Sequence, residues 1–161
     1  MRGASSSYYV TKEGVYHKPH DLQIILRKKL SGKISFTISH ISFQITIGFS
    51  FFQAKEFDQA ILLLNQLSPD LPTNDLKAEA QYWIAESYVG KNEFDIAITE
   101  FQRLRTSFPR ETRWTGLSEF RIAELHHDQG DIDTANAIFR EIIRVHGAAS
   151  DLGREAAKYL N

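Results

Sequence analysis

The sequence predicts an all-α protein, an array of about three helix-turn-helix units. A C-terminal capping helix closes the array, and a short leader that contains β-strands precedes it. Three observations predict this fold. Residues 80–109 have the pattern of two amphipathic helices, with apolar side chains at helical spacing on both sides of Gly90-Lys91-Asn92. The pattern recurs before and after this stretch, and each copy is followed by a residue that stops helices.

The repeat is visible at seven positions when the sequence is shifted forward by 38 residues, from Ile84 to Ile122, or backward by 37, from Ile84 to Ile47. Two of the seven positions keep small residues, which lets the two helices of a unit approach closely. The three copies read Ile47, Gly48, Phe57, Asp58, Ala60, Leu64 and Leu67; Ile84, Ala85, Phe94, Asp95, Ala97, Phe101 and Leu104; and Ile122, Ala123, Ile132, Asp133, Ala135, Phe139 and Ile142. A match that preserves residue size as well as hydropathy indicates an internal repeat.

This pattern resembles the tetratricopeptide repeat, a helix-turn-helix unit of about 34 residues. The period here is three or four residues longer, and the extra residues follow Pro72 and Pro109. There they add about one turn to the start of the next helix, which keeps its buried face in register. The resemblance covers roughly residues 41–161 and implies that the units form a right-handed superhelical array.

A narrower resemblance is carried by Tyr82-Trp83-Ile84-Ala85-Glu86, by Phe108-Pro109 and by the closing segment from Gly147 to Leu160. These segments look like bacterial envelope proteins of the repeat class, namely the periplasmic Tol-Pal coordinator and the repeat lipoproteins of outer-membrane assembly. The resemblance implies a non-enzymatic scaffold without cofactors. Such a scaffold would bind another protein or peptide in cell-envelope assembly or maintenance.

The chain divides into a leader, residues 1–40, and a repeat domain, residues 41–161. In the leader, Tyr8 to His17 reads as a hairpin, Asp21 as the cap of a short helix, and Lys33 to Ser39 as a strand. None of these elements matches a known family. The units of the repeat domain are expected near 41–77, 78–115 and 116–148, with the cap at 149–161.

Residues 41–52 carry two conflicting signals. Apolar β-branched and aromatic residues alternate from Ile41 to Phe51, as in a strand. The repeat register instead requires a helix, with Gly48 where Ala85 lies in the next unit. Because tertiary packing often overrides propensity, we predict a helix here. Beyond it, helices are expected at 56–67, 74–90, 93–107, 112–128, 131–145 and 151–160, with Thr73 or Asn74 and Ser150 as caps.

Composition restricts the functional class. The absence of cysteine in the 161-residue sequence excludes disulfides and thiolate metal sites. Residues 1–40 carry seven Lys/Arg and two Asp/Glu, a net charge of +5, whereas the rest carries 12 and 18, a net charge of −6. A basic leader can contact nucleic acid or a membrane. We interpret it as a solvated edge, because elements that would contact bases are lacking, and we expect no nucleic-acid partner.

No membrane span is expected, because polar residues interrupt the apolar stretch from Ile34 to Phe52. No signal peptide is readable at the N-terminus. The compartment therefore stays open between the periplasm, which the envelope resemblance implies, and the cytoplasm. A homo-oligomer is a further option.

We find no catalytic or metal-binding constellation, so we expect neither an enzyme nor a cofactor. His17 and His20, like the pair His126-His127, are interpreted as surface histidines. The repeat supplies a groove instead, since first helices line the concave side of such arrays. The partner-binding residues predicted there are Ile45, Phe49, Phe52, Tyr82, Glu86, Val89, Phe120, Glu124 and His127.

This surface is aromatic and apolar with an acidic strip, which suits a peptide with apolar anchors and a basic residue. Family members that bind chaperone tails hold a terminal carboxylate with Lys and Asn. Of the positions that hold these residues in the family, only the one occupied by Arg121 has a matching residue here. A ligand with a terminal carboxylate is therefore not expected. An alternative function is a regulatory or sensor fragment in which residues 1–40 act and the repeats dock them.

Overall fold

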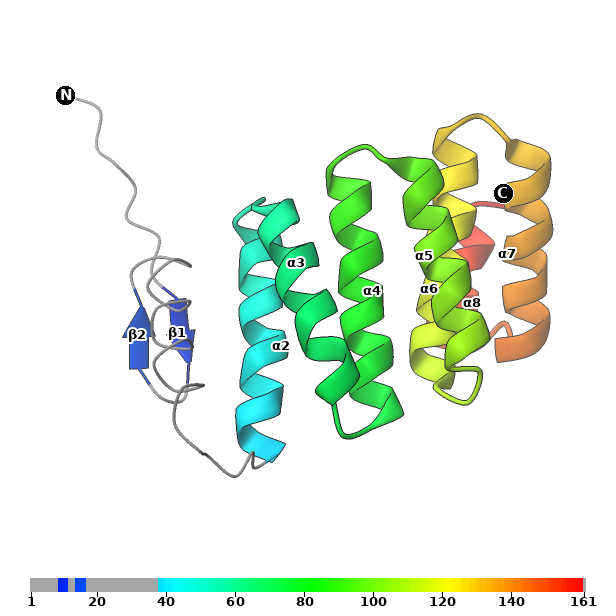
Figure 1. Cartoon of the computed structure of the whole chain (residues 1–161). Coiled ribbons are helices and arrows are strands. Elements are labelled where there is room, and N and C mark those ends of the chain that lie inside the picture. Colours follow the sequence, from blue (N-terminus) through cyan, green and yellow to red (C-terminus); the bar gives the residue numbers. More distant parts are fainter. Residues whose placement is uncertain (1–8, 12–13, 17–37, 161) are drawn as a thin grey trace.

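The computed structural model describes residues 9–11, 14–16 and 38–160, and the side chains from residue 45 onward (Figure 1). In the leader, β1 (Tyr9–Thr11) and β2 (Gly14–Tyr16) pair antiparallel, with Val10 opposite Val15. The helix expected after Asp21 and most of the strand expected from Lys33 lie outside the described residues. The last two residues of that expected strand, 38 and 39, are helical instead.

The remainder of the described chain is helical. Seven α-helices and one short 3-10 helix follow one another in the part that the structure describes: α2 (Ile38–Gln53), α3 (Phe57–Leu67), η1 (Ser68–Asp70), α4 (Asn74–Gly90), α5 (Phe94–Ser107), α6 (Thr112–Asp128), α7 (Ile132–His146) and α8 (Asp151–Lys158). The helix predicted over 41–52 is thus confirmed. The later helices begin and end within about two residues of the predicted bounds.

Each helix contacts the next along the chain, so α2–α3, α4–α5 and α6–α7 form successive antiparallel pairs (Figure 1). The first helices of neighbouring pairs also contact one another, α2 with α4 and α4 with α6, and α6 contacts α8 in the same way. This layered contact pattern is that of a repeat array, in which each unit packs against its neighbours alone.

The three pairs share one turn geometry. Lys55, Asn92 and Gly130 occupy equivalent places and have positive φ angles of 62°, 61° and 84°. In each turn the N–H of the following residue donates to a carbonyl five positions earlier, as from Glu93 to Tyr88 at 3.0 Å. Gly and Asn adopt this backbone region at low cost, whereas lysine pays a larger steric penalty.

The seam between paired helices is built from the small residues that the repeat predicted. Ala60, Ala97 and Ala135 have no exposed surface. A Cβ atom at Gly48 would lie 2.4 Å from Leu64 Cδ2, so only glycine allows α2 to approach α3 this closely. The alternating β-branched residues of α2 therefore form a helix, because this packing outweighs their strand propensity.

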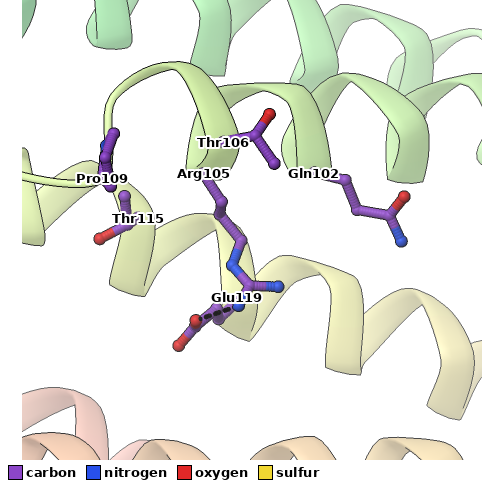
Figure 2. A pocket seen from close by; sticks show the side chains of 6 residues that line it. All are labelled: Gln102, Arg105, Thr106, Pro109, Thr115 and Glu119. Carbon is purple, nitrogen blue, oxygen red and sulfur yellow. Dashed lines mark ion pairs between the residues drawn. The ribbon is translucent and has the colours of Figure 1, made fainter.

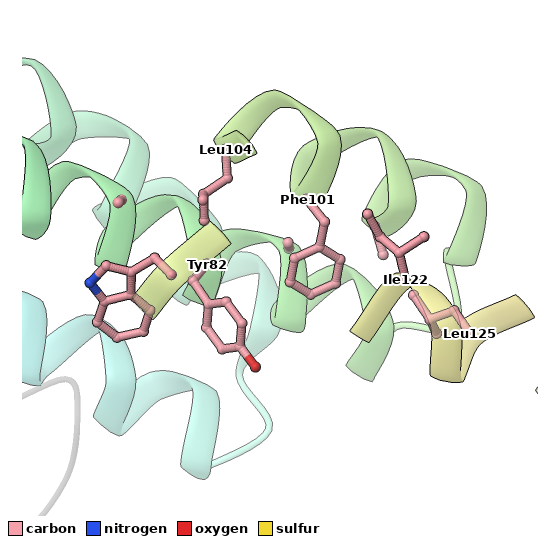
Figure 3. Packing of buried hydrophobic residues seen from close by; sticks show 9 residues of the cluster. Tyr82, Phe101, Leu104, Ile122 and Leu125 are labelled. Carbon is pink, nitrogen blue, oxygen red and sulfur yellow. The ribbon is translucent and has the colours of Figure 1, made fainter. Parts of the chain in front are cut away.

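The core is a series of apolar clusters, each between adjacent helices. The largest joins α4, α5 and α6 and includes Tyr82, Phe101, Leu104, Ile122 and Leu125 (Figure 3). Further clusters lie between α2, α3 and α4 and between α6, α7 and α8.

Two large apolar residues of α7 keep much of their surface exposed. The side chain of Ile132, one of the seven repeat positions, is 43% exposed, and that of Val145 is 55% exposed. Both lie near an end of α7.

Candidate partner-binding surface

Three half-buried rings from α2 and α4 form an aromatic cluster, defined here as Phe49, Phe52 and Trp83. The ring centroids of Phe49 and Trp83 are 4.4 Å apart, and those of Phe52 and Trp83 are 5.2 Å apart. Phe57 of α3 adds a fourth ring at 5.8 Å from Phe52. Because Gly48 allows α2 to pack closely against its neighbours, these rings meet where the α2–α3 pair contacts the α4–α5 pair.

A polar network continues the same surface toward the C-terminus. The Arg121 network consists of Glu86 on α4, Arg121 and Glu124 on α6, and Tyr159, which follows α8. Arg121 donates from Nε and Nη2 to the two oxygens of Glu86, at 2.5 and 3.1 Å, and from Nη1 to Glu124 at 2.5 Å. The Tyr159 hydroxyl donates to the other Glu124 oxygen at 2.7 Å. One guanidinium thus ties successive helix pairs together through charge-assisted bonds.

Electrostatics in the network follow from this geometry. Burial disfavours the charged form of Arg121, but the hydrogen bonds and charges of Glu86 and Glu124 outweigh it and raise the pKa. The hydrogen bond to Glu124, followed by burial, raises the pKa of Tyr159 to about 12. Arg121 therefore stays charged and Tyr159 stays protonated at neutral pH.

A second carboxylate lies beside the aromatic cluster. Glu79 is half-buried on α4, four residues before Trp83. Burial raises the pKa of its carboxyl above the ordinary value, and a hydrogen bond from Trp83 opposes that shift. Trp83 is thus flanked along α4 by Glu79 on one side and Glu86 on the other.

Three predicted surface residues are buried instead: Glu86, 8% exposed, in the Arg121 network, and Ile45 and Tyr82 in the apolar core. Ile45 is 3% exposed and packs with Leu64 and Ile84. Tyr82 is 8% exposed, and its ring lies 5.5 Å from those of both Phe101 and Trp114. Figure 3 shows Tyr82 beside Phe101 in this cluster. Burial, then the nearby Glu86, raises the pKa of the Tyr82 hydroxyl. Tyr82 therefore serves packing, and the half-buried ring that we expected there belongs to Trp83.

The other predicted residues fall into two groups. Phe49 and Phe52 join the aromatic cluster, and Val89 is half-buried farther along α4. Around the C-terminal end, Tyr159 brings three of them together. Its ring lies 5.8 Å from Phe120 and 5.3 Å from His127, and its hydroxyl binds Glu124. Glu86 connects the two groups through Arg121.

Three residues of this surface, Trp83, Arg121 and Tyr159, were absent from the predicted set. A sequence signal existed for all three, because Trp83, Arg121 and Tyr159 follow one another at the repeat spacing of 38 residues. The Glu124–Tyr159 hydrogen bond is the repeat equivalent of the Glu86–Arg121 bond, since both join residues 35 positions apart.

A separate hollow of ≈ 520 Å³ lies between α5 and α6 (Figure 2). All but one of its lining residues are polar or charged, and an ion pair of 2.6 Å joins Arg105 to Glu119. The remaining lining residues are Gln102, Thr106, Pro109 and Thr115. Because its charged groups satisfy each other, the hollow offers no free charge to a ligand.

Comparisons with known proteins agree with the fold. Residues 79–110 and 118–147 each match the tetratricopeptide repeat family, and these segments correspond to α4–α5 and α6–α7. No significant match was found among curated proteins. Within the described part of the chain, no helix has the length and hydropathy needed to cross a membrane. The α4–α5 and α6–α7 helix pairs are therefore similar to tetratricopeptide repeats.

Proposed function

We propose that this protein is a non-enzymatic scaffold that binds a partner protein or peptide on its first-helix face. This face is the surface formed by α2, α4 and α6 around Phe49, Trp83 and Arg121. Tetratricopeptide repeats generally mediate protein–protein interactions, which supports an interaction role for the chain. Among the residues predicted for this role, Phe49, Phe52, Val89, Phe120, Glu124 and His127 keep part of their surface exposed.

The observation that carries the proposal is the aromatic cluster. Its three rings keep part of their surface exposed although they lie at the junction of two helix pairs. Large aromatic side chains that remain half-exposed on a rigid helical frame are typical anchors of protein interfaces. A frame of packed helices also presents them without a large ordering cost on binding.

A site-specific photo-cross-linker tests this proposal. We would place benzoylphenylalanine at Val89 on the first-helix face, and at the exposed Thr99 on α5 as the matched control. After irradiation in the cells that express the chain, covalent adducts are expected from position 89 and not from position 99. Adducts in equal yield at both positions, or at position 99 alone, would rule out the first-helix face.

We further propose that the partner belongs to bacterial cell-envelope assembly or maintenance. This proposal draws on the resemblance of residues 82–86 and of the C-terminal segment to envelope repeat proteins. Mass spectrometry of the adducts from position 89 checks it. Envelope proteins should dominate those adducts, and a set of cytosolic proteins would refute the envelope role while leaving the scaffold role intact.

A further inference from the structure

We propose that the partner segment is cationic: it places a large apolar side chain on the aromatic cluster and a lysine or arginine beside Glu79. This inference rests on the proposed function, because it names the chemistry of the partner for the same first-helix face. It also assigns the binding to the part of that face formed by α2 and α4.

The aromatic cluster supplies the apolar half of the argument. Phe49, Phe52 and Trp83 contact one another with centroids 4.4 to 6.1 Å apart, so they form one patch and not three isolated rings. Among the described residues, the cations found over aromatic rings are Lys91 on Tyr88 and Arg113 on Trp114. Neither of these two cations lies over the aromatic cluster. The exposed part of its rings can therefore contact an apolar side chain or the stem of a long basic one.

The charges of the first-helix face indicate that the partner segment is cationic. Glu86, Glu124 and Arg121 together carry one negative charge. Glu79 adds a second, because the charges of Asp75 and Arg113, which act on its carboxyl in opposite directions, cancel. The first-helix face around α4 therefore has a net charge of −2. The described side chains of α2, residues 45–53, add no charge. A partner segment with positive charge is attracted to such a surface, and a segment with a carboxylate is repelled.

Arg121 does not reverse this preference. Its Nε, Nη1 and Nη2 atoms all donate to Glu86 or Glu124. The carboxylates of Glu86 and Glu124 more than offset its positive charge, so an incoming carboxylate would meet a group with a net charge of −1. The arginine that agrees with the carboxylate-binding pattern is therefore occupied by the chain's own glutamates.

Selection from a phage-displayed library of random 12-residue peptides on the full chain tests the inference. We expect enrichment of peptides that combine a large apolar residue with a lysine or arginine within about one helical turn or two extended residues. Enriched peptides would then be synthesised with a fluorescent label and titrated by polarisation against variants of the chain.

Phe52→Ala should weaken binding of these peptides about 5- to 30-fold, the effect of losing one interface anchor. Leu62→Ala is the matched control, because Leu62 is an exposed apolar residue on α3, 58% accessible and outside the first-helix face. The control should leave affinity unchanged. If thermal melting shows that Phe52→Ala is unfolded, Phe52→Leu replaces it, with a smaller expected loss.

Glu79→Gln should weaken binding about 2- to 5-fold at low salt, and this difference should shrink near 1 M salt, where exposed charges are screened. Enrichment of acidic peptides, or affinity unaffected by both Phe52→Ala and Glu79→Gln, would overturn the inference.

The two proposals fail differently. Peptides that depend on Glu124 and His127 instead of Phe52 would refute the inference and keep the first-helix face as the binding surface. If no peptide is enriched and position 89 gives no adduct, both proposals are refuted.

Discussion

At the scale of single residues, small side chains set the distance between helices. Ala60, Ala97 and Ala135 have no exposed surface, and each lies where a second helix meets its first helix. Gly48 is the extreme case, since the side chain of Leu64 occupies the space that a Cβ atom would need. Larger residues at these positions would push the helices apart and open the clusters behind them.

Tyr159 gives a residue-scale prediction in alkaline solution. Its folded-state pKa is raised to about 12, above the ordinary value of 10.0, so the protonated phenol is favoured by the fold. The corresponding stability is fully present below pH 10 and is lost as the pH rises toward 12. Tyr159→Phe should reduce the loss of thermal stability between pH 10 and 12, measured by circular dichroism. At neutral pH it should cost about 1 kcal/mol, the net value of one hydrogen bond.

The same measurements of melting temperature against pH can also contradict this prediction. If the melting temperatures of the two proteins fall in parallel across this pH range, Tyr159 does not titrate with a raised pKa. Tyr82 is present in both proteins, so its own raised pKa does not affect the difference between them.

At the scale of elements, α8 closes the array although it has only eight residues. Ser150 begins it, accepting a hydrogen bond from the Gly153 N–H at 2.9 Å. Ala156 has no exposed surface and packs in the cluster that contains Phe139 and Ile142. Leu152, Tyr159 and Leu160 cover the same cluster from its outer side.

Removal of residues 149–161 should therefore cause self-association. The truncation exposes Phe139 and Ile142, both fully buried in the intact chain, and terminal units of repeat arrays need a polar outer face. Size-exclusion chromatography with light scattering should show oligomers or aggregates, with the full-length chain at equal concentration as the control. A truncated chain that stays monomeric with an unchanged melting temperature would show that α8 is dispensable.

At the scale of the whole molecule, packing contacts between neighbouring helix pairs hold the array together. Hydrogen bonds between polar side chains join the same helix pairs. The Trp114 indole N–H donates to Asp75 at 2.9 Å, and Arg121 binds Glu86, so both bonds join α4 to α6. In an array of weakly coupled units, such bonds make the units unfold together.

Arg121→Met should destabilise the array by about 3 kcal/mol, because it leaves Glu86 largely buried without a counter-ion. The double variant Glu86→Gln/Arg121→Met removes both charges and should recover a large part of this loss. Urea denaturation of the two variants and the parent measures both values. If the double variant is at least as unstable as Arg121→Met alone, the cost does not come from an unpaired charge.

Local signals in the sequence determined most of the helical array. The spacing of apolar residues and the caps at Thr73 and Ser150 located the helices from α3 to α8, since these features depend on neighbours within a few residues. The internal repeat also predicted the alanine seam and, against local β propensity, the helix α2. The register of the repeat carries tertiary information that a single stretch of sequence does not.

Only the tertiary structure decided which side chains of the first-helix face are exposed. Tyr82 and Trp83 are adjacent on α4 and point about 100° apart, so the position of the neighbouring helices decides which of them is buried. Phe101 and Trp114 enclose Tyr82, while Trp83 stays half-buried beside Phe49. The repeat places Tyr159 opposite Glu124 as it places Arg121 opposite Glu86, but only the docking of α8 decides that the Tyr159 hydroxyl reaches the Glu124 carboxylate.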